Sequence, residues 1–304
     1  MAEAASSPRR ITAPAIAARK GSASPIVMIT AYDAPSARIV DDVGADVILV
    51  GDSLANVVLG YTDTLQVTID DMAHHVGAVA RTTPRALVVG DLPWLSYHVS
   101  IPDTVCNAAR LVRAGAGAVK LEGGRKRIDA VRAILDAEIP VMGHLGLTPQ
   151  SVHALGGFRV QGRDLEAARA IVDDAVALAD AGCFGIVLEC VPDAVARLVT
   201  DTVDIPTIGI GAGRHCDGQV LVFHDILGLE ERMTPKFVRR YADLGTDART
   251  ALTAFAEDVR EGRFPSSEET YHAADTVADE IALYGRNAEA TGAVEPGVEA
   301  GSQA

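Results

Sequence analysis

The sequence predicts an α/β protein built as one (β/α)8 barrel, the TIM-barrel fold. Eight short runs rich in apolar and β-branched residues follow one another between Ile26 and Phe223. The runs are mostly apolar, which is typical of parallel strands that are buried on both faces. Between the runs, apolar residues recur at steps of three and four, the spacing of amphipathic helices. Eight strands that alternate with helices fit a closed barrel better than an open doubly wound sheet.

These two patterns place the elements in chain order. The predicted strands cover residues 26–32, 47–50, 86–89, 118–121, 140–143, 185–188, 206–209 and 219–223, the last being the weakest pattern. Helical spacing covers residues 36–43, 105–114, 127–137, 165–181 and 194–202. Further helix is expected over residues 234–262, before Pro265 and two serines break the pattern.

The chain divides into three parts by composition. We expect residues 1–25 to form an N-terminal extension and residues 26–272 to form the barrel with its C-terminal helices. Residues 273–304 are rich in Ala, Glu, Gly and Asp and hold few large apolar side chains. We expect this acidic tail to be partly disordered, because it cannot bury enough apolar surface to offset the entropy of ordering.

Composition narrows the class of partner. The chain has 304 residues, with 27 basic and 41 acidic side chains and a net charge of −14. No basic stripe is present to neutralise a nucleic acid or an anionic membrane, so small molecules are the expected partners. The four cysteines form no C-x-x-C pair, which favours reduced thiols. Residues 1–20 lack the apolar core of a signal peptide, and no stretch reaches about 18 apolar residues, so we expect a cytoplasmic protein.

Polar residues stand where the predicted strands end. In a (β/α)8 barrel the active site lies at the C-terminal ends of the strands, so these residues are the candidates for chemistry. They are Asp52, Ser53, Asp91, Lys120, Glu122, His144 and Glu189. Residues two apart on a strand share a face, which predicts that Lys120 and Glu122 point to the same side.

Each candidate also has a purely structural interpretation. Asp52 and Asp91 follow glycines and could cap turns, and Glu122 precedes two glycines and could lie in an exposed loop. Glu189 and Lys120 have apolar neighbours, where an unpaired charge is costly. Residues 156–163 form a glycine-bounded polar loop that could be either a lid or an ordinary surface loop.

A cluster of carboxylates indicates a bound cation. Two carboxylates about 4 Å apart repel by about 4 kcal/mol at an effective dielectric constant of about 20, so the group needs a cation or must take up protons. Oxygen ligands without thiolates favour Mg2+ over Zn2+. A 2-keto acid chelates such an ion, and its neighbouring carbon then loses a proton more easily. Glu189 is the candidate base and Lys120 a balancing charge.

Several segments together resemble the ketopantoate hydroxymethyltransferase family. They are residues 50–53 (Val-Gly-Asp-Ser), 64–68 (Thr-Leu-Gln-Val-Thr), 90–93 (Gly-Asp-Leu-Pro), 119–124 (Val-Lys-Leu-Glu-Gly-Gly), 143–151, 156–163, 188–192, 208–213 and 217–219. The likeness runs from about residue 27 to residue 272. The resemblance implies a Mg2+-dependent barrel enzyme that transfers a hydroxymethyl group from 5,10-methylenetetrahydrofolate to 3-methyl-2-oxobutanoate. The product is 2-dehydropantoate, on the way to pantothenate and coenzyme A.

The resemblance also assigns roles to residues. It implies that Asp52, Asp91 and Glu122 hold the metal, and that Glu189 accepts the C3 proton. Asp52, Ser53, Asp91, Lys120 and His144 would contact the keto acid. The family's usual assembly is a large ring-like homo-oligomer, often a decamer. The sequence does not separate folate from another reduced pterin as the one-carbon carrier.

Two other functions fit part of this pattern. A carbon–carbon lyase of the isocitrate lyase or phosphoenolpyruvate mutase kind would share the metal and the carboxylates, but it usually carries a Lys-Cys-Gly loop that this sequence lacks. A metabolite-binding barrel without catalysis would bind ligand without turnover, and the intact set of acidic residues argues against it. Exchange of the C3 proton of the keto acid distinguishes the three.

Overall fold

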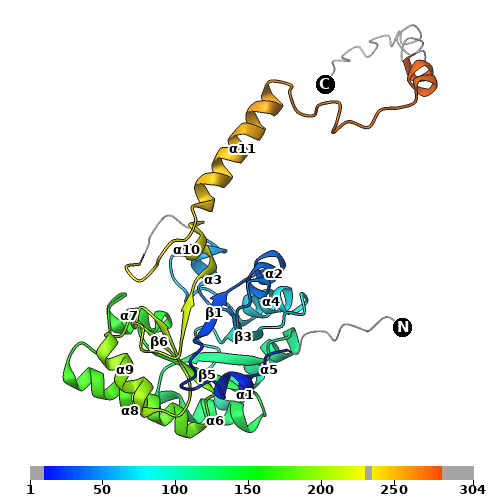
Figure 1. Cartoon of the computed structure of the whole chain (residues 1–304). Helices are drawn as coiled ribbons and strands as arrows, with labels where there is room; N and C mark the ends of the chain where they lie inside the picture. The colour runs from blue at the N-terminus through cyan, green and yellow to red at the C-terminus, as the bar shows by residue number, and fades with distance from the viewer. Residues whose placement is uncertain (1–9, 230–234, 283–304) are drawn as a thin grey trace, which may run out of the picture. The chain divides into compact units, whose positions relative to one another are not determined.

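The computed structural model describes residues 10–229 and 235–282 and confirms the closed barrel (Figure 1). Eight parallel strands follow one another in chain order, and pairing of β8 with β1 closes the ring. The strands are β1 (Ile26–Thr30), β2 (Val47–Val50), β3 (Leu87–Asp91), β4 (Ala118–Glu122), β5 (Val141–Gly146), β6 (Gly185–Glu189), β7 (Thr207–Ile210) and β8 (Gly218–Leu221). All eight predicted strands are therefore confirmed, with ends that differ by a few residues.

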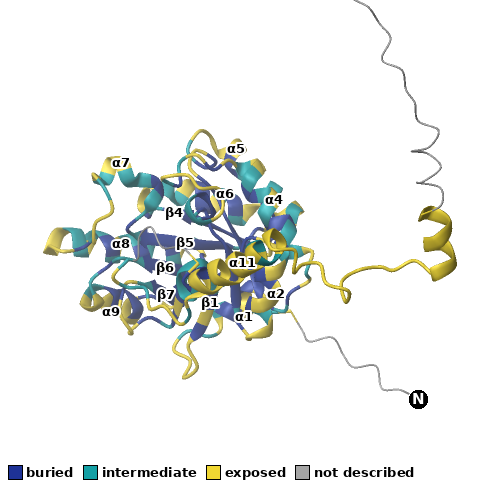
Figure 2. Ribbon diagram, turned by 90° about the horizontal axis from the view of Figure 1, so that it is seen from above, coloured by how far each residue is buried: buried dark blue, intermediate teal, exposed yellow. Residues whose placement is uncertain are grey.

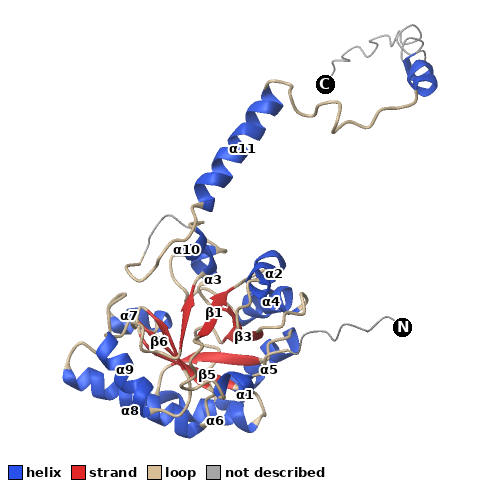
Figure 3. Ribbon diagram, viewed as in Figure 1, coloured by secondary structure: helices blue, strands red, loops and turns tan. Residues whose placement is uncertain are grey.

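The strands are apolar on both faces because each face meets a different hydrophobic cluster. On β2, Val47 and Leu49 belong to a cluster with Met28 and Val89, whereas Ile48 and Val50 belong to the cluster shared with the helices. The first cluster fills the barrel, and the second lies between the strands and the helices. Figure 3 shows these helices around the strands. Two buried faces explain why the strands read as continuous apolar runs.

Polar caps and glycines set the ends of the helices. The side chains of Asp33, Thr68, Ser100 and Asp164 accept hydrogen bonds at the first turns of α2, α4, α5 and α8, and α5 and α8 end at left-handed glycines. The helices are α1 (Ala13–Ala17), α2 (Ala34–Asp42), α3 (Leu54–Val57), α4 (Ile69–Ala80), α5 (Ile101–Ala114), α6 (Ile128–Asp136), α7 (Val152–Leu155), α8 (Leu165–Ala181), α9 (Asp193–Thr202), α10 (Phe223–Leu227) and α11 (Leu244–Arg260). Single 3-10 turns at Arg125–Arg127 and Pro149–Ser151 precede α6 and α7.

The prediction of helix over residues 234–262 is correct only for α11. Residue 234 lies outside the described residues, and residues 235–243 are not helical. In that segment Phe237 packs against Gly211 at the end of β7, and the Tyr241 backbone N–H donates to the Ile226 carbonyl at 2.8 Å. The Phe237 side chain and the Tyr241 backbone thus make tertiary contacts instead of forming part of a helix.

The described part of the predicted extension packs against the barrel. In α1, Ile16 and Ala13 are 1% and 3% exposed and join the cluster inside the barrel. The Lys20 ammonium lies 3.0 Å from the Asp217 carboxylate, and the Ile11 N–H donates to the Arg85 carbonyl at 2.8 Å. These contacts lie at the N-terminal ends of the strands, so residues 10–25 cover that end of the barrel.

The chain forms two compact units, Met1–Gly245 and Thr246–Ala304. In the described part of the second unit, α11 is followed by a non-helical stretch in which Phe264 contacts Phe255 at a ring separation of 5.2 Å. Residues 275–282 are helical, and residues 283–304 of the predicted acidic tail lie outside the described residues. Within the described residues, no helix has the length and apolarity to cross a membrane. Burial is concentrated in the strands and the inward faces of the first unit's helices (Figure 2).

We expect Ile16→Ala to lower the free energy of unfolding by about 2–5 kcal/mol, because it leaves a cavity inside the barrel. Ile39→Ala is the matched control: Ile39 is 51% exposed on α2, and its loss should change the free energy of unfolding by no more than about 0.5 kcal/mol. Urea denaturation measures both variants. Equal, small effects would contradict a structural role for residues 10–25.

Candidate active site

The inner faces of the strands change from apolar to ionisable toward their C-terminal ends. On β4, Ala118 belongs to the cluster inside the barrel, and Lys120 and Glu122 follow it at steps of two. The same step leads from Val89 to Asp91 on β3, from Met142 to His144 on β5 and from Val187 to Glu189 on β6. Because residues two apart share a face, the side chains meet in the barrel mouth, above an apolar floor.

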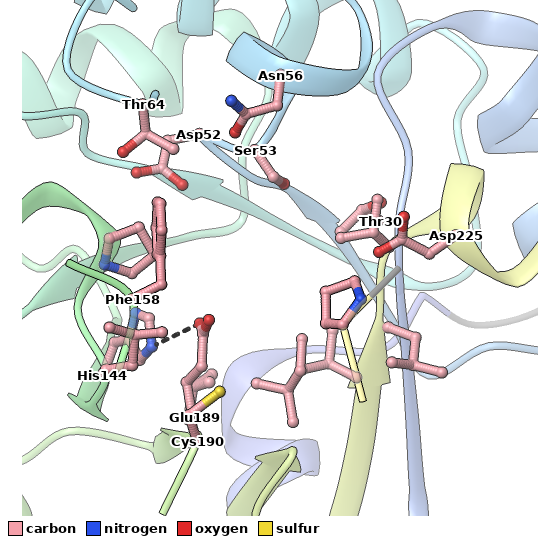
Figure 4. Close-up of a pocket in the computed structure, with 18 of the residues that line it drawn as sticks. Thr30, Asp52, Ser53, Asn56, Thr64, His144, Phe158, Glu189, Cys190 and Asp225 are labelled. Atoms are coloured by element: carbon pink, nitrogen blue, oxygen red, sulfur yellow. Dashed lines mark ion pairs between the residues drawn. The ribbon is translucent and has the colours of Figure 1, made fainter. Parts of the chain in front are cut away.

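All seven predicted site residues line one cavity of about 640 Å3 at this end of the barrel. We call Asp52, Asp91, Lys120, Glu122, His144 and Glu189 the ionisable cluster. The side chain of Glu189 is 16% exposed, and the other five residues of the cluster are buried. Figure 4 shows Asp52, Ser53, His144 and Glu189 around the open space. The structure thus brings these residues together around one cavity, and Glu122 lies buried on β4 rather than in an exposed loop.

A buried ion pair links β3 to β4. Asp91 and Lys120 are register partners, and Lys120 Nζ lies 2.7 Å from Asp91 Oδ1. The second oxygen, Oδ2, accepts a hydrogen bond from the Asp52 backbone N–H at 3.1 Å. Burial lowers the pKa of Lys120, but the charges of Asp91, Asp52 and Glu122 outweigh burial and raise the pKa above its ordinary value. Lys120 is therefore charged at neutral pH.

His144 lies between two carboxylates. Its Nδ1 is 3.4 Å from Glu122 Oε1, and its Nε2 is 3.3 Å from Glu189 Oε2. Burial and the neighbouring Lys120 ammonium lower the pKa of His144, but the bonds with Glu122 and Glu189 prevail and raise it to about 9. The ring is thus protonated at neutral pH and can donate to both carboxylates.

Asp52 is the fourth carboxylate of the ionisable cluster, and its pKa reflects the excess of carboxylates over cationic side chains in that cluster. Burial, followed by repulsion from Asp91 and Glu122, raises the pKa of Asp52 to about 8, against the smaller opposing effects of Lys120 and Gln150. Four carboxylates of the ionisable cluster face only two cationic side chains, Lys120 and protonated His144. Without a further cation, Asp52 therefore holds a proton near neutral pH.

The residues present fit a magnesium ion. A divalent cation would balance the excess charge and allow Asp52 to ionise, and carboxylate oxygens are the ligands that Mg2+ prefers. Among residues 10–229 and 235–282, no three His, Cys, Asp or Glu side chains already have the arrangement of a metal cluster. Mg2+ needs only one or two carboxylates beside water and substrate oxygens, so this absence is compatible with Asp52 and Asp91 as ligands.

Gln150 connects the ionisable cluster, and the sequence analysis did not identify it. Its Nε2 donates to Asp52 Oδ2 at 2.8 Å and to the Leu92 carbonyl at 3.0 Å, and its backbone N–H donates to Glu122 Oε2 at 3.0 Å. Its Oε1 accepts from the Tyr97 hydroxyl at 2.6 Å. Gln150 is only 5% exposed. A buried amide with all these partners fixes the orientation of two carboxylates from different strands.

Two tyrosines support the site in the same way. The Tyr32 hydroxyl lies 2.8 Å from Ser53 Oγ, and the Tyr97 hydroxyl also accepts from the Glu122 N–H at 3.3 Å. Burial, the largest effect, raises the pKa of both phenols, so both stay neutral hydrogen-bonding groups. Their signal in the sequence is weak, because a lone tyrosine is more often an ordinary core residue.

The glycine-bounded loop contributes to the cavity wall. Phe158, Arg159 and Val160 line the cavity, and the Gln161 N–H donates to the Cys190 carbonyl at 2.9 Å. This bond attaches the loop to the residue that follows Glu189. The loop is therefore part of the site.

A (β/α)8 barrel with a buried ionisable cluster in its mouth belongs to the class of barrel enzymes that act on small molecules. The family model described as ketopantoate hydroxymethyltransferase matches residues 10–267, and this chain belongs to that family. The match includes residues 10–25, which agrees with their packing against the barrel.

Individual relatives agree with the family model. A 3-methyl-2-oxobutanoate hydroxymethyltransferase of Syntrophomonas wolfei is 54% identical over 90% of this chain and 99% of its own length. One from Moorella thermoacetica is 56% identical over 86% of this chain and 98% of its own length.

Solved structures share the fold at low sequence identity. A phosphoenolpyruvate phosphomutase from Streptomyces platensis subsp. rosaceus superposes with a TM-score of 0.55 at 16% identity, covering 92% of this chain and 99% of that chain. A 2,3-dimethylmalate lyase gives 0.55 at 18% identity over the same shares. These likenesses show the barrel fold alone.

We expect Gln150→Leu to lower the free energy of unfolding by about 1–3 kcal/mol, since it leaves buried polar groups unpaired. Hydroxymethyltransferase activity should fall by about tenfold or more, because Asp52 and Glu122 lose their shared orientation. Gln66→Leu, a change at an exposed position, is the control. Denaturation and steady-state kinetics measure the two effects. Full activity in Gln150→Leu would contradict the positioning role.

Proposed function

We propose that this protein transfers a hydroxymethyl group from 5,10-methylenetetrahydrofolate to 3-methyl-2-oxobutanoate and forms 2-dehydropantoate, in the synthesis of pantothenate and coenzyme A. Family membership supports the overall reaction. The observation that carries the chemistry is Glu189, a half-buried carboxylate that lines the cavity and is held by a protonated histidine. Such a group can remove a proton from a bound carbon acid.

Mg2+ is the proposed cofactor, with Asp52 and Asp91 as ligands and Glu122 as the third carboxylate of the site. When bound, the ion polarises the keto group of the substrate and so makes the C3 proton more acidic. Asp91 is already oriented by Lys120, and Asp52 by Gln150. Two prearranged carboxylates lose little conformational freedom when they take up a cation.

Glu189 is the proposed proton acceptor at C3. His144 Nε2 forms an ion pair with Glu189 Oε2 at 3.3 Å, so we propose that the other oxygen, Oε1, receives the proton. The positive charge of His144, 3.3 Å from Glu189 Oε2, holds the carboxylate in place before the reaction. The carbon that has lost its proton then forms a bond to the one-carbon unit of the folate. The bonds from that unit to the folate nitrogens break, and a water molecule supplies the hydroxyl group of the product and the proton that leaves on tetrahydrofolate.

Ser53, Lys120 and His144 are the proposed contacts of the keto acid, together with Asp52 and Asp91. The Ser53 hydroxyl is oriented by the buried Tyr32, and the Lys120 ammonium stays charged beside Asp91. A substrate carboxylate in this place would meet a cation and a hydroxyl that are both already fixed. We also propose that the protein acts in the cytoplasm as a homo-oligomer, for which the resemblance implies a decamer, with no nucleic-acid or membrane partner.

Exchange of the C3 proton with solvent tests this function without the folate. Wild-type protein should exchange the proton of 3-methyl-2-oxobutanoate in the presence of Mg2+ and form product once the folate is added. Glu189→Gln should still bind the keto acid. It should exchange the C3 proton at about one hundredth of the wild-type rate or more slowly, because the base is lost. Glu166→Gln, on the exposed first turn of α8, is the control. Unchanged exchange in Glu189→Gln would refute its role, and no exchange in wild-type protein would refute the proposed function.

Mg2+ affinity should depend on pH through Asp52. In the metal-free protein this carboxyl has a pKa of about 8, so a bound proton competes with the cation below that pH. Affinity should rise by up to about tenfold per pH unit from about pH 6 and level off above about pH 8. Asp52→Asn should bind Mg2+ weakly at every pH, whereas the exposed control Asp180→Asn should follow wild type. Calorimetric titration measures the affinity, and a wild-type affinity independent of pH would contradict Asp52 as a ligand.

A further inference from the structure

The backbone of Glu189 lies very close to the end of β5. Gly146 and Glu189 are register partners on β5 and β6. A Cβ added to Gly146 would lie 2.2 Å from the Glu189 carbonyl oxygen and 2.5 Å from Val191 Cγ2, far inside the separation of about 3.5–4.0 Å that packed atoms prefer. Gly146 also has φ +93°, a conformation that residues with a side chain rarely adopt. The position therefore admits only glycine, for steric and for conformational reasons.

Three backbone hydrogen bonds fix Glu189 and the residue that follows it. The Leu147 N–H donates to the Glu189 carbonyl at 2.8 Å. The Cys190 N–H donates to the Ile210 carbonyl at 2.9 Å, and the Cys190 carbonyl accepts from the Gln161 N–H at 2.9 Å. The partners belong to the end of β5, to β7 and to the glycine-bounded loop. The backbone at Glu189 is thus held from three directions.

Cys190 has a left-handed backbone conformation, with φ +49°. A residue other than glycine in this conformation is strained and keeps it only where the surrounding structure imposes it. Burial, with a smaller effect of the Glu189 charge, raises the pKa of the Cys190 thiol to about 11, so the reactive thiolate is scarce at neutral pH. What Cys190 contributes to the site is therefore the turn of its backbone, directly after Glu189.

The spacing of β5 and β6 determines the geometry of the pair formed by His144 and Glu189. His144 lies two residues before Gly146 on β5, and its Nε2 is 3.3 Å from Glu189 Oε2 (Figure 4). The two side chains leave neighbouring strands, and the absence of a side chain at Gly146 lets these strand ends approach. A side chain at position 146 would push the end of β6 away from β5, and the carboxylate would move with it.

We propose that Gly146 is a positioning residue for the proton acceptor, and that the left-handed turn at Cys190 completes the same support. The inference rests on the proposed function, in which Glu189 removes the C3 proton. Both residues act through the backbone of Glu189 and hold its carboxylate beside His144. The proposed metal ligands Asp52 and Asp91 lie at the ends of other strands, so a change at this junction should slow proton removal and spare the binding of metal and keto acid.

Gly146→Ala tests this role through a split between rate and affinity. Exchange of the C3 proton at saturating keto acid and Mg2+ should slow by about tenfold or more, because a displacement of about 1 Å in a reacting group is costly. The Kd values for Mg2+ and for the keto acid, measured by calorimetric titration, should change by less than about threefold. A general loss of structure would weaken exchange and both affinities together.

Gly143→Ala is the matched control on the same strand. A Cβ added to Gly143 would lie 2.7 Å from Leu178 Cδ1, a side-chain atom of α8, and its three nearest neighbours all belong to Leu178. The control therefore crowds the outside of the barrel instead of Glu189. It should lower the melting temperature, as Gly146→Ala does, but leave the exchange rate of the bound keto acid within about twofold of wild type.

Substitutions at Cys190 keep the test decisive if Gly146→Ala does not fold. Cys190→Gly adopts the left-handed conformation freely and should exchange within about threefold of wild type. Cys190→Val should exchange about tenfold more slowly, because a β-branched side chain disfavours that conformation. Equal exchange in the two Cys190 variants, or unchanged exchange in Gly146→Ala, would overturn the inference. Equal losses of exchange and of both affinities in Gly146→Ala would also overturn it. None of these results would affect the proposed function, which fails only if wild-type protein shows no exchange and no transfer.

Discussion

The buried ion pair between Asp91 and Lys120 is the constraint on which the rest of the site depends. It joins neighbouring strands in register, and it supplies the only lysine in the ionisable cluster. Removing one partner would leave an isolated charge in the barrel, which is far more costly than the pair itself. The pair also fixes Asp91 Oδ2 against the Asp52 backbone, so that the ends of β2, β3 and β4 are linked through one carboxylate.

The inside of the barrel contributes to stability near the N-terminal ends of the strands and holds the candidate active site near their C-terminal ends. Toward the N-terminal ends of the strands the inner face is filled by Met28, Val47 and Met142, which are hardly exposed at all. Two residues beyond Met142 on β5, the same face carries His144, which pairs with Glu122 of the adjoining strand β4. Burial and neighbouring charges perturb the pKa of His144 and of Asp52 in this place. Strand periodicity places His144 there, and Asp52 follows the end of β2.

Much of this arrangement could be predicted from local patterns. Apolar runs predicted the eight strands, and the position of Asp91 and Glu122 at strand ends predicted the site. Both predictions were possible because each depends only on a short stretch of sequence. Gln150 could not be found in this way, since an uncharged amide gains its role only from contacts with residues far away in the sequence. Residues 235–243 were predicted as helix for a related reason, because the spacing of apolar residues does not reveal that Phe237 packs on Gly211.

The small helix α1 affects which end of the barrel is accessible to ligands. With Ile16 inserted among the strands, the N-terminal end is filled by apolar side chains. The cavity lies at the opposite end, where Phe158 and Lys236 line it, so we expect ligands to enter and leave there. Under the proposed function both substrates share this one route, and the substrate that binds second would then cover the one that binds first.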